Sequence, residues 1–474
     1  MTAEGVHVSA RSIPPEFVLG AATAAFQIEG AAAEDGRTDS IWDAFCRTPG
    51  AVLNGDTGDV ACDHYHRWRD DVALMRDLDL DAYRFSTSWS RVRPDGGDPN
   101  PAGVAFYDRL VDELLASGID PWLTLYHWDM PQTLQEKGGW AVRETVDRFV
   151  EYALTLHDAL GDRITRWTTF NEPWCSSFLS YTAGVHAPGR QSISEGLRAS
   201  HHLLLAHGRT VPELRSRGAT DIGITLNLTN ADPVDATDEA DERAARLIDG
   251  QFNRWFLDPL FRSAYPADIV EDIRQVDERA VAEFEVAIHT GDRAAISTPL
   301  DFLGVNYYHG EYVGGQKAAV PPPVTEAPTD RATSSPFPVN DGIYPHERGM
   351  ARTNMGWEID PDGLRRLLNR VWNDYAQGPS VPLYVTESGR ASDTGVQDDD
   401  RVEYVRDHVR ATLEAAEDGV DVRGFFYWSL LDNFEWAWGY GRRFGIVDVD
   451  YETQVRTVKA SGREFSRLIR ERSL

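Results

Sequence analysis

The chain has 474 residues, 42% of them hydrophobic, and a formal net charge of −29 at pH 7. This is enough apolar material for a large core, and no run of roughly 18 apolar residues predicts a membrane span. The acidic balance argues against nucleic acid or an anionic membrane surface as a partner, because both are bound through basic patches.

The basic residues are almost all arginines. Lysine occurs only at Lys137, Lys317 and Lys459, within a total of 47 Lys and Arg residues. An acidic, lysine-poor surface fits solubility at high salt, but a GC-rich coding sequence would favour arginine as well. Adaptation to salt therefore stays an open alternative.

The three cysteines, Cys46, Cys62 and Cys175, cannot all pair, and their spacing matches no metal site. The segment Met1–Gly20 lacks the basic start and apolar stretch of a signal peptide. We therefore expect a soluble cytoplasmic protein in a reducing compartment, without a metal or a cofactor. The oligomeric state stays open, and a homo-oligomer is compatible with the sequence.

Short apolar runs alternate along the chain with longer segments of helical period, which is typical of repeated βα units and a parallel sheet. Helical apolar spacing is found, in chain order, at Trp68–Leu78, Val104–Ser117, Val142–Ala159 and Ser194–Arg217, the last followed by Gly218 as a C-cap. The strands are expected at Phe17–Ala21, Ala82–Phe85, Pro121–Tyr126, Thr165–Phe170, Asp221–Leu226, Phe302–Asn306, Leu383–Thr386 and Gly424–Trp428.

Eight strand–helix pairs predict an α/β protein with a closed (β/α)8 barrel, in which no edge strand is left exposed. Length alone would favour about three domains, but barrels of this kind run long as single domains. We therefore expect one catalytic domain over residues 1–474. The segment Lys317–Asn354 is rich in proline and polar residues, and we interpret it as a long loop over the catalytic face and not as a domain linker.

Two glutamates lie where such a barrel places its chemistry. Glu172 follows the fourth expected strand in Thr-Phe-Asn-Glu-Pro, and Glu387 follows the seventh in Val-Thr-Glu-Ser-Gly. Pro173 and Gly389 end the two strands. A carboxylate at the carboxyl end of a barrel strand faces the catalytic side, whereas a lone glutamate there is more often only solvated. As a pair, the two carboxylates suggest a general acid and a nucleophile.

These contexts resemble the family 1 glycoside hydrolases, the β-glucosidase family. The resemblance covers nearly the whole chain, in the family's order, at Phe17–Gly30, Asp63–Trp68, Tyr83–Ser86, His127–Gln132, Asp301–Tyr308, Asp432–Trp436 and Arg443–Val447. It implies a retaining β-glycosidase that removes terminal β-D-glucosyl residues through a covalent glycosyl-enzyme intermediate, with the two carboxyl groups about 5 Å apart. It also implies small β-glycosides or cello-oligosaccharides as substrates, with β-galactosides and β-fucosides as further ones, and a part in cellulose degradation.

By this resemblance, Glu172 is the acid/base and Glu387 the nucleophile. Glu172 has apolar neighbours and no cation close in sequence, a setting that raises the pKa of a carboxyl group. Arg84 and the phenol of Tyr308 would support Glu387 and keep its pKa low, although Arg84 could also belong to an ordinary structural ion pair. Asn171 would bond the 2-hydroxyl of the sugar.

A further set looks like the sugar pocket, which needs side chains that both donate and accept hydrogen bonds beside an aromatic platform. His127 alone would more often be a satisfied core histidine, but it ends a barrel strand. Trp357 is expected on the aglycone side, together with Trp174. The full set of expected substrate-binding residues is Gln27, His127, Trp128, Asn171, Asn306, Tyr308, Trp357, Trp428, Glu435 and Trp436.

Two positions depart from the family pattern. Ser388 stands where the family has asparagine after the nucleophile, so the packing of that loop is expected to differ, with a changed rate but no loss of activity. Trp438 stands where many relatives have a smaller or charged residue, and it could reshape the pocket floor or entrance. Cys175, three residues after Glu172, is interpreted as a small buried hydrophobic residue, with a reactive thiol as the alternative.

Three other functions fit the sequence less well. Relatives that cleave 6-phosphosugars carry a lysine-bearing phosphate pocket, but this chain keeps Glu435 and has no lysine between Lys317 and Lys459. Thioglucosidases lose the acid/base glutamate, and non-catalytic carbohydrate-binding relatives lose one carboxylate. Both Glu172 and Glu387 are present here.

Overall fold

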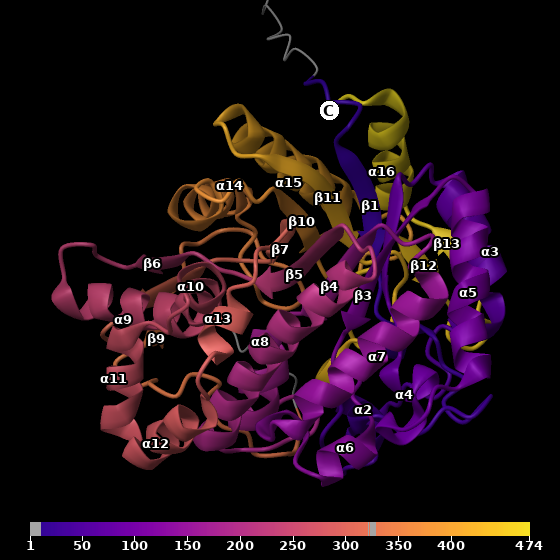
Figure 1. Cartoon of the computed structure of the whole chain (residues 1–474). Helices are drawn as coiled ribbons and strands as arrows, with labels where there is room; N and C mark the ends of the chain where they lie inside the picture. The colour runs from indigo at the N-terminus through magenta and orange to yellow at the C-terminus, as the bar shows by residue number, and fades with distance from the viewer. Residues whose placement is uncertain (1–10, 321, 323–328) are drawn as a thin grey trace, which may run out of the picture.

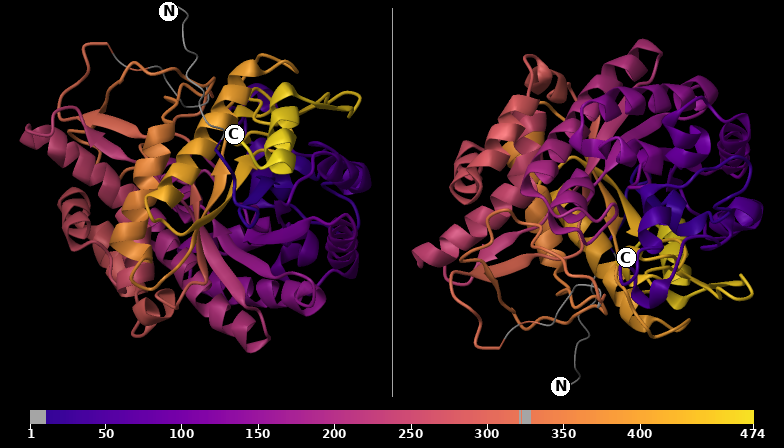
Figure 2. Two further views of the ribbon diagram at one scale, coloured as in Figure 1. Left: turned by 90° about the horizontal axis from the view of Figure 1, so that it is seen from above. Right: turned by 90° about the horizontal axis from the view of Figure 1, so that it is seen from below.

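The computed structural model describes residues 11–320, 322 and 329–474. Eight parallel strands close into a barrel in the order β1-β11-β10-β7-β5-β4-β3-β2, and helices surround it (Figures 1 and 2). The barrel strands are β1 (Val18–Ala22), β2 (Ala82–Ser86), β3 (Asp120–Tyr126), β4 (Arg166–Asn171), β5 (Asp221–Asn227), β7 (Phe302–Asn306), β10 (Leu383–Ser388) and β11 (Val422–Trp428). The eight expected strands and the (β/α)8 fold are therefore confirmed, with ends that differ by one or two residues.

The four expected helices are also present, as α3 (His64–Asp77), α5 (Pro101–Ala116), α7 (Glu144–Leu160) and α8 (Ile193–Ser216). The side chain of Ser192 caps the start of α8 by accepting from the backbone of Glu195, and Gly218 follows its end at φ +100°, which suits a glycine.

Further helices complete the outer layer and the loops on the catalytic face. They are α1 (Ala25–Ile28), α2 (Ile41–Cys46), α4 (Trp89–Val92), α6 (Gln132–Glu136), α9 (Glu239–Asp249), α10 (Trp255–Arg262), α11 (Ala267–Val276), α12 (Glu278–Ala287), α13 (Asp292–Ile296), α14 (Pro361–Val371), α15 (Asp399–Glu417) and α16 (Ala460–Glu471). Among the helices of the described ranges, none combines the length and apolar character needed to cross a bilayer.

Short strands outside the barrel pair in two small sheets. One contains β6 (Ala231–Pro233), β8 (Glu311–Gly314) and β9 (Tyr344–Pro345), and the other β12 (Val447–Val449) and β13 (Arg456–Val458). The strand β9 belongs to the expected loop Lys317–Asn354, of which residues 321 and 323–328 lie outside the described part. Pro336 and Phe337 of that loop line the main cavity of the catalytic face, as expected of a loop over the active-site mouth.

Aromatic side chains fill the barrel interior. The ring of Trp122 on β3 is fully buried, and its indole N–H donates to Thr168 at 2.8 Å. Three rings from β7, β10 and β11 pack edge-on against it at 4.9 to 5.0 Å, those of Phe302, Tyr384 and Phe426. One side chain thus joins four strands across the barrel, with the edge-to-face geometry that aromatic rings prefer.

We expect Trp122→Ala to lower the free energy of unfolding by about 3–5 kcal/mol, because it removes a buried ring and leaves a cavity that the closed barrel cannot collapse. A lower denaturant midpoint in urea, followed by tryptophan fluorescence, would show this. Val286→Ala is the control, since Val286 is 78% exposed and its truncation should change stability by less than about 0.5 kcal/mol. Equal midpoints for the two variants would contradict the role given to Trp122.

Candidate active site

A cavity of about 340 Å³ lies at the carboxyl ends of the barrel strands and contains both glutamates. Glu172 directly follows β4, and His127 directly follows β3. Glu387 lies inside β10, one residue before its end, and not beyond the strand as the sequence suggested. The expected residues that line the cavity are His127, Trp128, Glu172, Trp174, Asn306, Tyr308, Trp357, Glu387, Trp428, Glu435 and Trp436.

Glu172 is buried in a tightly bonded position. Its backbone has φ +48°, in the left-handed region that few non-glycine residues adopt, and its N–H donates to the carbonyl of Thr225 at 3.0 Å. Asn306 donates to one carboxyl oxygen at 2.6 Å, and the thiol of Cys175 donates to the other at 3.1 Å. Burial, followed by the charge of Glu387, raises the pKa of Glu172 to about 7.

Glu387 is equally buried but is contacted by a cation. Arg84 donates to one of its carboxyl oxygens at 2.6 Å, and the hydroxyl of Tyr308 donates to the other at 2.7 Å. Burial nevertheless outweighs these contacts and raises the pKa of Glu387 above its ordinary value. The prediction of a low pKa for this residue is therefore wrong in direction.

The two carboxyl groups differ in their contact with a cation, and this difference favours ionisation of one before the other. Arg84 contacts Glu387 directly, whereas it makes no hydrogen bond or ion pair with Glu172 and lowers the pKa of Glu172 only through its charge. Direct contact with a cation stabilises the ionised form. We therefore take Glu387 as the carboxyl group that ionises first and Glu172 as the one that keeps its proton.

Two asparagines connect the glutamates. The Oδ1 atom of Asn171 accepts from Arg84 at 2.7 Å and from the amide of Asn306 at 3.1 Å. The same Asn306 amide reaches Glu172, and its own Oδ1 accepts from Thr386 at 2.7 Å. A continuous chain of hydrogen bonds therefore runs from Glu387 through Arg84, Asn171 and Asn306 to Glu172.

This chain also determines the tautomer of His127. Because Oδ1 of Asn171 accepts two bonds, its Nδ2 is the donor to Nε2 of His127 at 3.0 Å. Burial and the charge of Arg84 lower the pKa of His127 well below its ordinary value, so the ring is neutral. The proton is then on Nδ1, which has no hydrogen-bond partner among the described residues and can donate to a ligand.

Indole rings form the walls of the cavity. Trp128 and Trp436 lie 4.5 Å apart between ring centroids, and the ring of His127 stacks on Trp428 at 5.6 Å. Trp357 packs beside Tyr308 at 5.4 Å. Between these rings, burial raises the pKa of Glu435 to about 8, and within the described chain one of its carboxyl oxygens has no partner. The combination of flat apolar faces with a few convergent polar atoms is what a sugar ring requires.

Three of the expected residues do not line the cavity. Arg84 and Asn171 lie beneath it and act through the network described above. Gln27 is fully buried, and its amide nitrogen donates to Asn433 at 3.1 Å and to the carbonyl of Phe434 at 2.7 Å. A direct contact between Gln27 and substrate stays a prediction.

The structure also adds residues that the sequence did not assign to the site. Cys175 is buried, as expected, but it does not only fill space, because its thiol donates a hydrogen bond to the carboxyl group of Glu172. Its position three residues after Glu172 was the available signal. Others had no such signal, because they come from distant segments: His186, Asn227, Phe252 and Phe337.

The two departures from the family pattern lie in different places. The hydroxyl of Ser388 pairs with that of Tyr404 on α15 at 3.1 Å and does not line the cavity. Trp438 does line it, and the guanidinium of Arg442 stacks on its ring at 3.8 Å. A large aromatic residue therefore stands at the cavity wall, as the sequence suggested.

Comparison with known proteins identifies the family. The family model described as Glycosyl hydrolase family 1 matches residues 9–474. The chain belongs to glycoside hydrolase family 1. It is 46% identical, over 98% of its length and 92% of the relative's, to thermostable β-glucosidase B of Thermobispora bispora. It is 44% identical to a bifunctional β-D-glucosidase/β-D-fucosidase of Bifidobacterium breve, over 97% of this chain and 98% of the other.

Solved structures of family 1 members show the same fold. The crystal structure of a psychrophilic β-glucosidase from Micrococcus antarcticus superposes with a TM-score of 0.93 at 53% identity, over 98% of each chain. The family 1 β-glucosidase of Thermotoga maritima in complex with isofagomine lactam superposes with a TM-score of 0.87 at 41% identity, over 98% of this chain and 100% of that one.

In this family 1 site, the thiol of Cys175 should influence the alkaline limb of the pH profile, which the pKa of Glu172 sets. Its hydrogen bond stabilises the ionised form of Glu172 and so lowers the pKa of Glu172. Cys175→Ala should therefore raise that pKa and move the alkaline limb of activity to higher pH, by roughly half a unit for one neutral hydrogen bond. The pH dependence of kcat on a nitrophenyl glycoside measures the shift. Cys175→Ser keeps a donor and should retain the original limb; a downward shift in the alanine variant would contradict the assignment.

Proposed function

We propose that this chain is a retaining β-glucosidase in which Glu172 is the acid/base and Glu387 the nucleophile. One observation carries the assignment of roles: of the buried carboxyl groups that share the cavity, Glu172, Glu387 and Glu435, only that of Glu387 is directly held by a guanidinium. Membership of family 1 and relatives that are named β-glucosidases support the reaction.

In the first step, a carboxylate oxygen of Glu387 attacks the anomeric carbon, and the bond to the leaving oxygen breaks. Glu172 gives its proton to that oxygen, so the aglycone leaves as a neutral alcohol. A pKa of about 7 keeps Glu172 protonated under mildly acidic conditions and still lets it release the proton. The product of this step is a glycosyl ester of Glu387.

In the second step, Glu172 acts as a base towards water. Esterification removes the negative charge of Glu387, which is one of the influences that raise the pKa of Glu172. The pKa of Glu172 therefore falls, and the ionised group takes a proton from the attacking water. The carboxylate of Glu387 leaves, the sugar is released with its original configuration, and both groups return to their starting state.

The polar atoms of the cavity suit a neutral sugar. The Nδ1–H of His127 donates and the free carboxyl oxygen of Glu435 accepts. Because Asn171 does not line the cavity, its expected bond to the 2-hydroxyl stays a prediction. Trp428 and Trp436 provide faces for the apolar side of the ring. None of the described residues that line the cavity is Lys or Arg, so the pocket offers no counter-ion to a phosphosugar.

We further propose β-fucosides and β-galactosides as secondary substrates and cello-oligosaccharides as natural ones. The name of the Bifidobacterium breve relative supports the first, and that of a 1,4-β-D-glucan glucohydrolase from Thermotoga neapolitana supports the second. We place the reaction in the cytoplasm, within one catalytic domain over residues 1–474.

The nucleophile is tested by removal and replacement. Glu387→Ala should lose nearly all turnover of p-nitrophenyl β-glucoside, and azide should restore it by forming an α-glucosyl azide, because the anion enters from the face that the carboxylate occupied. The product is identified by NMR. A β-azide, or wild-type rates without azide, would overturn the assignment of Glu387. Retention in the wild type is checked by following the anomer first released.

The acid is tested by its pH profile. The protonated fraction of Glu172 falls as pH rises through about 7, so cleavage of glucosides with poor leaving groups should decline above that pH. Glu172→Gln cannot ionise and should lose this limb on 2,4-dinitrophenyl β-glucoside, whose leaving group needs no proton. Persistence of the same limb in the glutamine variant would show that another group is the acid.

The sugar pocket is tested at Glu435. Glu435→Ala should lower kcat/KM for aryl glucosides by well over tenfold, since a sugar hydroxyl loses its partner inside a closed site. Glu435→Gln keeps the shape and one acceptor and should lose less. An unchanged kcat/KM in the alanine variant would mean that the sugar does not reach Glu435.

A further inference from the structure

The strand that carries Glu387 is irregular at its carboxyl end. Where β7 advances by one residue, from Val305 to Asn306, the paired positions on β10 advance by two and end at Glu387. A similar shift of register occurs between β10 and β11. Such a β-bulge bends the strand, interrupts its ladder of hydrogen bonds and re-aims the side chains at its end. The direction of the Glu387 carboxylate therefore depends also on contacts outside the ladder.

The residue after Glu387 is held from the helical layer. Successive side chains of a strand point to opposite faces, so Ser388 faces the surrounding helices while Glu387 lines the cavity. The hydroxyl of Ser388 is hydrogen-bonded to that of Tyr404 at 3.1 Å, and both side chains are buried. Tyr404 belongs to α15, the long helix that follows β10 in the barrel. A bond between strand and helix therefore lies directly beside the nucleophile.

Tyr404 is itself firmly placed. Its ring stacks on that of His408, one turn further along α15, at 3.7 Å between ring centroids. Nδ1 of His408 donates to the backbone carbonyl of Tyr404 at 2.9 Å, and burial lowers the pKa of His408 to about 4, so this ring is neutral at neutral pH. Burial also raises the pKa of Tyr404, which keeps its phenol protonated. The phenol therefore presents a fixed, neutral hydroxyl to Ser388.

The same helix contacts the loop after the nucleophile at a second point. Arg401, which is fully buried, donates to the backbone carbonyl of Arg390 at 3.3 Å. Between Ser388 and Arg390 lies Gly389, where a Cβ would be 1.8 Å from the carbonyl oxygen of Trp428. The backbone of this glycine therefore packs closely against the end of β11, while α15 holds the residue on either side of it.

We propose that Tyr404 is a positioning residue for the nucleophile: through Ser388 it fixes the bulged end of β10 and so the direction of the Glu387 carboxylate. The proposal rests on the proposed β-glucosidase function and deepens it. Tyr404 does not line the cavity and acts only through the strand. Direct attack needs a carboxylate oxygen in line with the anomeric carbon, and a small misplacement lowers the rate strongly. Loss of the bond between Ser388 and Tyr404 therefore slows the attack and leaves sugar binding unchanged.

Trapping of the nucleophile measures its attack separately from binding. With 2,4-dinitrophenyl 2-deoxy-2-fluoro-β-glucoside, a carboxylate oxygen of Glu387 bonds to the anomeric carbon as dinitrophenolate leaves with the bonding electrons. The fluorine slows hydrolysis of the resulting ester, so the inactivated enzyme accumulates. The dependence of inactivation on concentration gives a rate constant for the attack and a binding constant. Because dinitrophenolate needs no proton, the measurement does not depend on Glu172.

Tyr404→Phe removes one oxygen atom and keeps the ring that stacks on His408. The rate constant of inactivation should fall about tenfold, with the binding constant unchanged within about twofold. Ser388→Ala removes the same bond from the strand and should give the same loss. The double variant should lose no more than either single variant, because both act through one bond. Tyr375→Phe is the matched control, since it removes a buried phenol that donates to Asp258 at 2.8 Å away from the cavity, and it should change neither constant.

The outcomes separate the two proposals. A wild type that is not inactivated, or that peptide mass spectrometry shows to be labelled at a residue other than Glu387, would overturn the proposed function. Labelling at Glu387 with an unchanged rate constant in Tyr404→Phe would overturn the positioning role alone, and Ser388→Ala decides in the same way if the phenylalanine variant does not fold. A loss that comes from the binding constant, or losses that add in the double variant, would likewise overturn the role of Tyr404.

Discussion

The chemistry of this site depends on the contact between Arg84 and Glu387. Burial raises the pKa of both catalytic carboxyl groups, and the charge of Glu387 raises that of Glu172 further, whereas Arg84 lowers the pKa of Glu387. Arg84 donates to the carboxylate of Glu387 at 2.6 Å and so stabilises its ionised form. It also donates to Asn171, where the chain of hydrogen bonds to Glu172 begins. The same guanidinium therefore distinguishes the two glutamates and links their positions.

The closed barrel is what makes this contact possible. Arg84 comes from β2, Asn171 from β4, Asn306 from β7 and Glu387 from β10, so the network spans the barrel mouth. Asn306 pairs in register with Glu387 on one side and with Asn227 of β5 on the other. A shift of one residue in any of these strands would turn the side chains to the opposite face. Burial of an arginine that is only 1% exposed is tolerable because its contacts with Glu387 and Asn171 compensate part of the lost hydration.

Features that depend on residues adjacent in the sequence could be predicted, whereas features that depend on packing between distant segments could not. The strands are short apolar runs bounded by turn residues, so their positions were correct to within one or two residues. The motifs around Glu172 and Glu387 identified the two carboxyl groups that the structure places in one cavity. The pKa of Glu387 was predicted in the wrong direction because burial depends on loops that close over the strand ends, which no local pattern reports. The contact of Gln27 with the sugar stays a prediction: its amide nitrogen donates to Asn433 and Phe434, and its Oε1 has no partner among the described residues.

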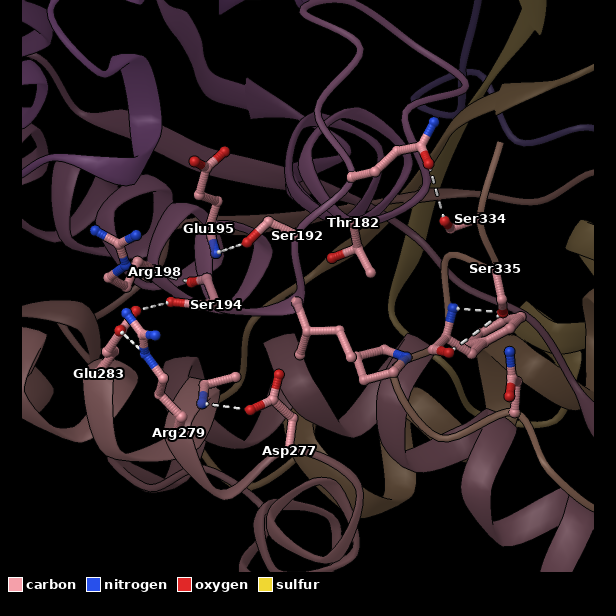
Figure 3. A pocket seen from close by; sticks show the side chains of 16 residues that line it. Thr182, Ser192, Ser194, Glu195, Arg198, Asp277, Arg279, Glu283, Ser334 and Ser335 are labelled. Carbon is pink, nitrogen blue, oxygen red and sulfur yellow. Dashed lines mark hydrogen bonds and ion pairs between the residues drawn. The ribbon is translucent and has the colours of Figure 1, made fainter. Parts of the chain in front are cut away.

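The segment after β4 shows where this predictability ends. It begins with Glu172 and continues as a π-helix over Cys175–Ala183. Cys175 contacts the carboxyl group of Glu172, and Thr182 lines a different cavity (Figure 3). The position of Glu172 could be predicted from the motif Thr-Phe-Asn-Glu-Pro, because the reaction requires a carboxyl group at the end of β4. The last residues of the segment pack against α8, and the carbonyl of Ala183 accepts from Ser334 of the long loop, so their surroundings depend on tertiary packing. Strand ends therefore position the two catalytic carboxyl groups, whereas the loops beyond them complete the cavity wall with residues such as Phe252 and Phe337.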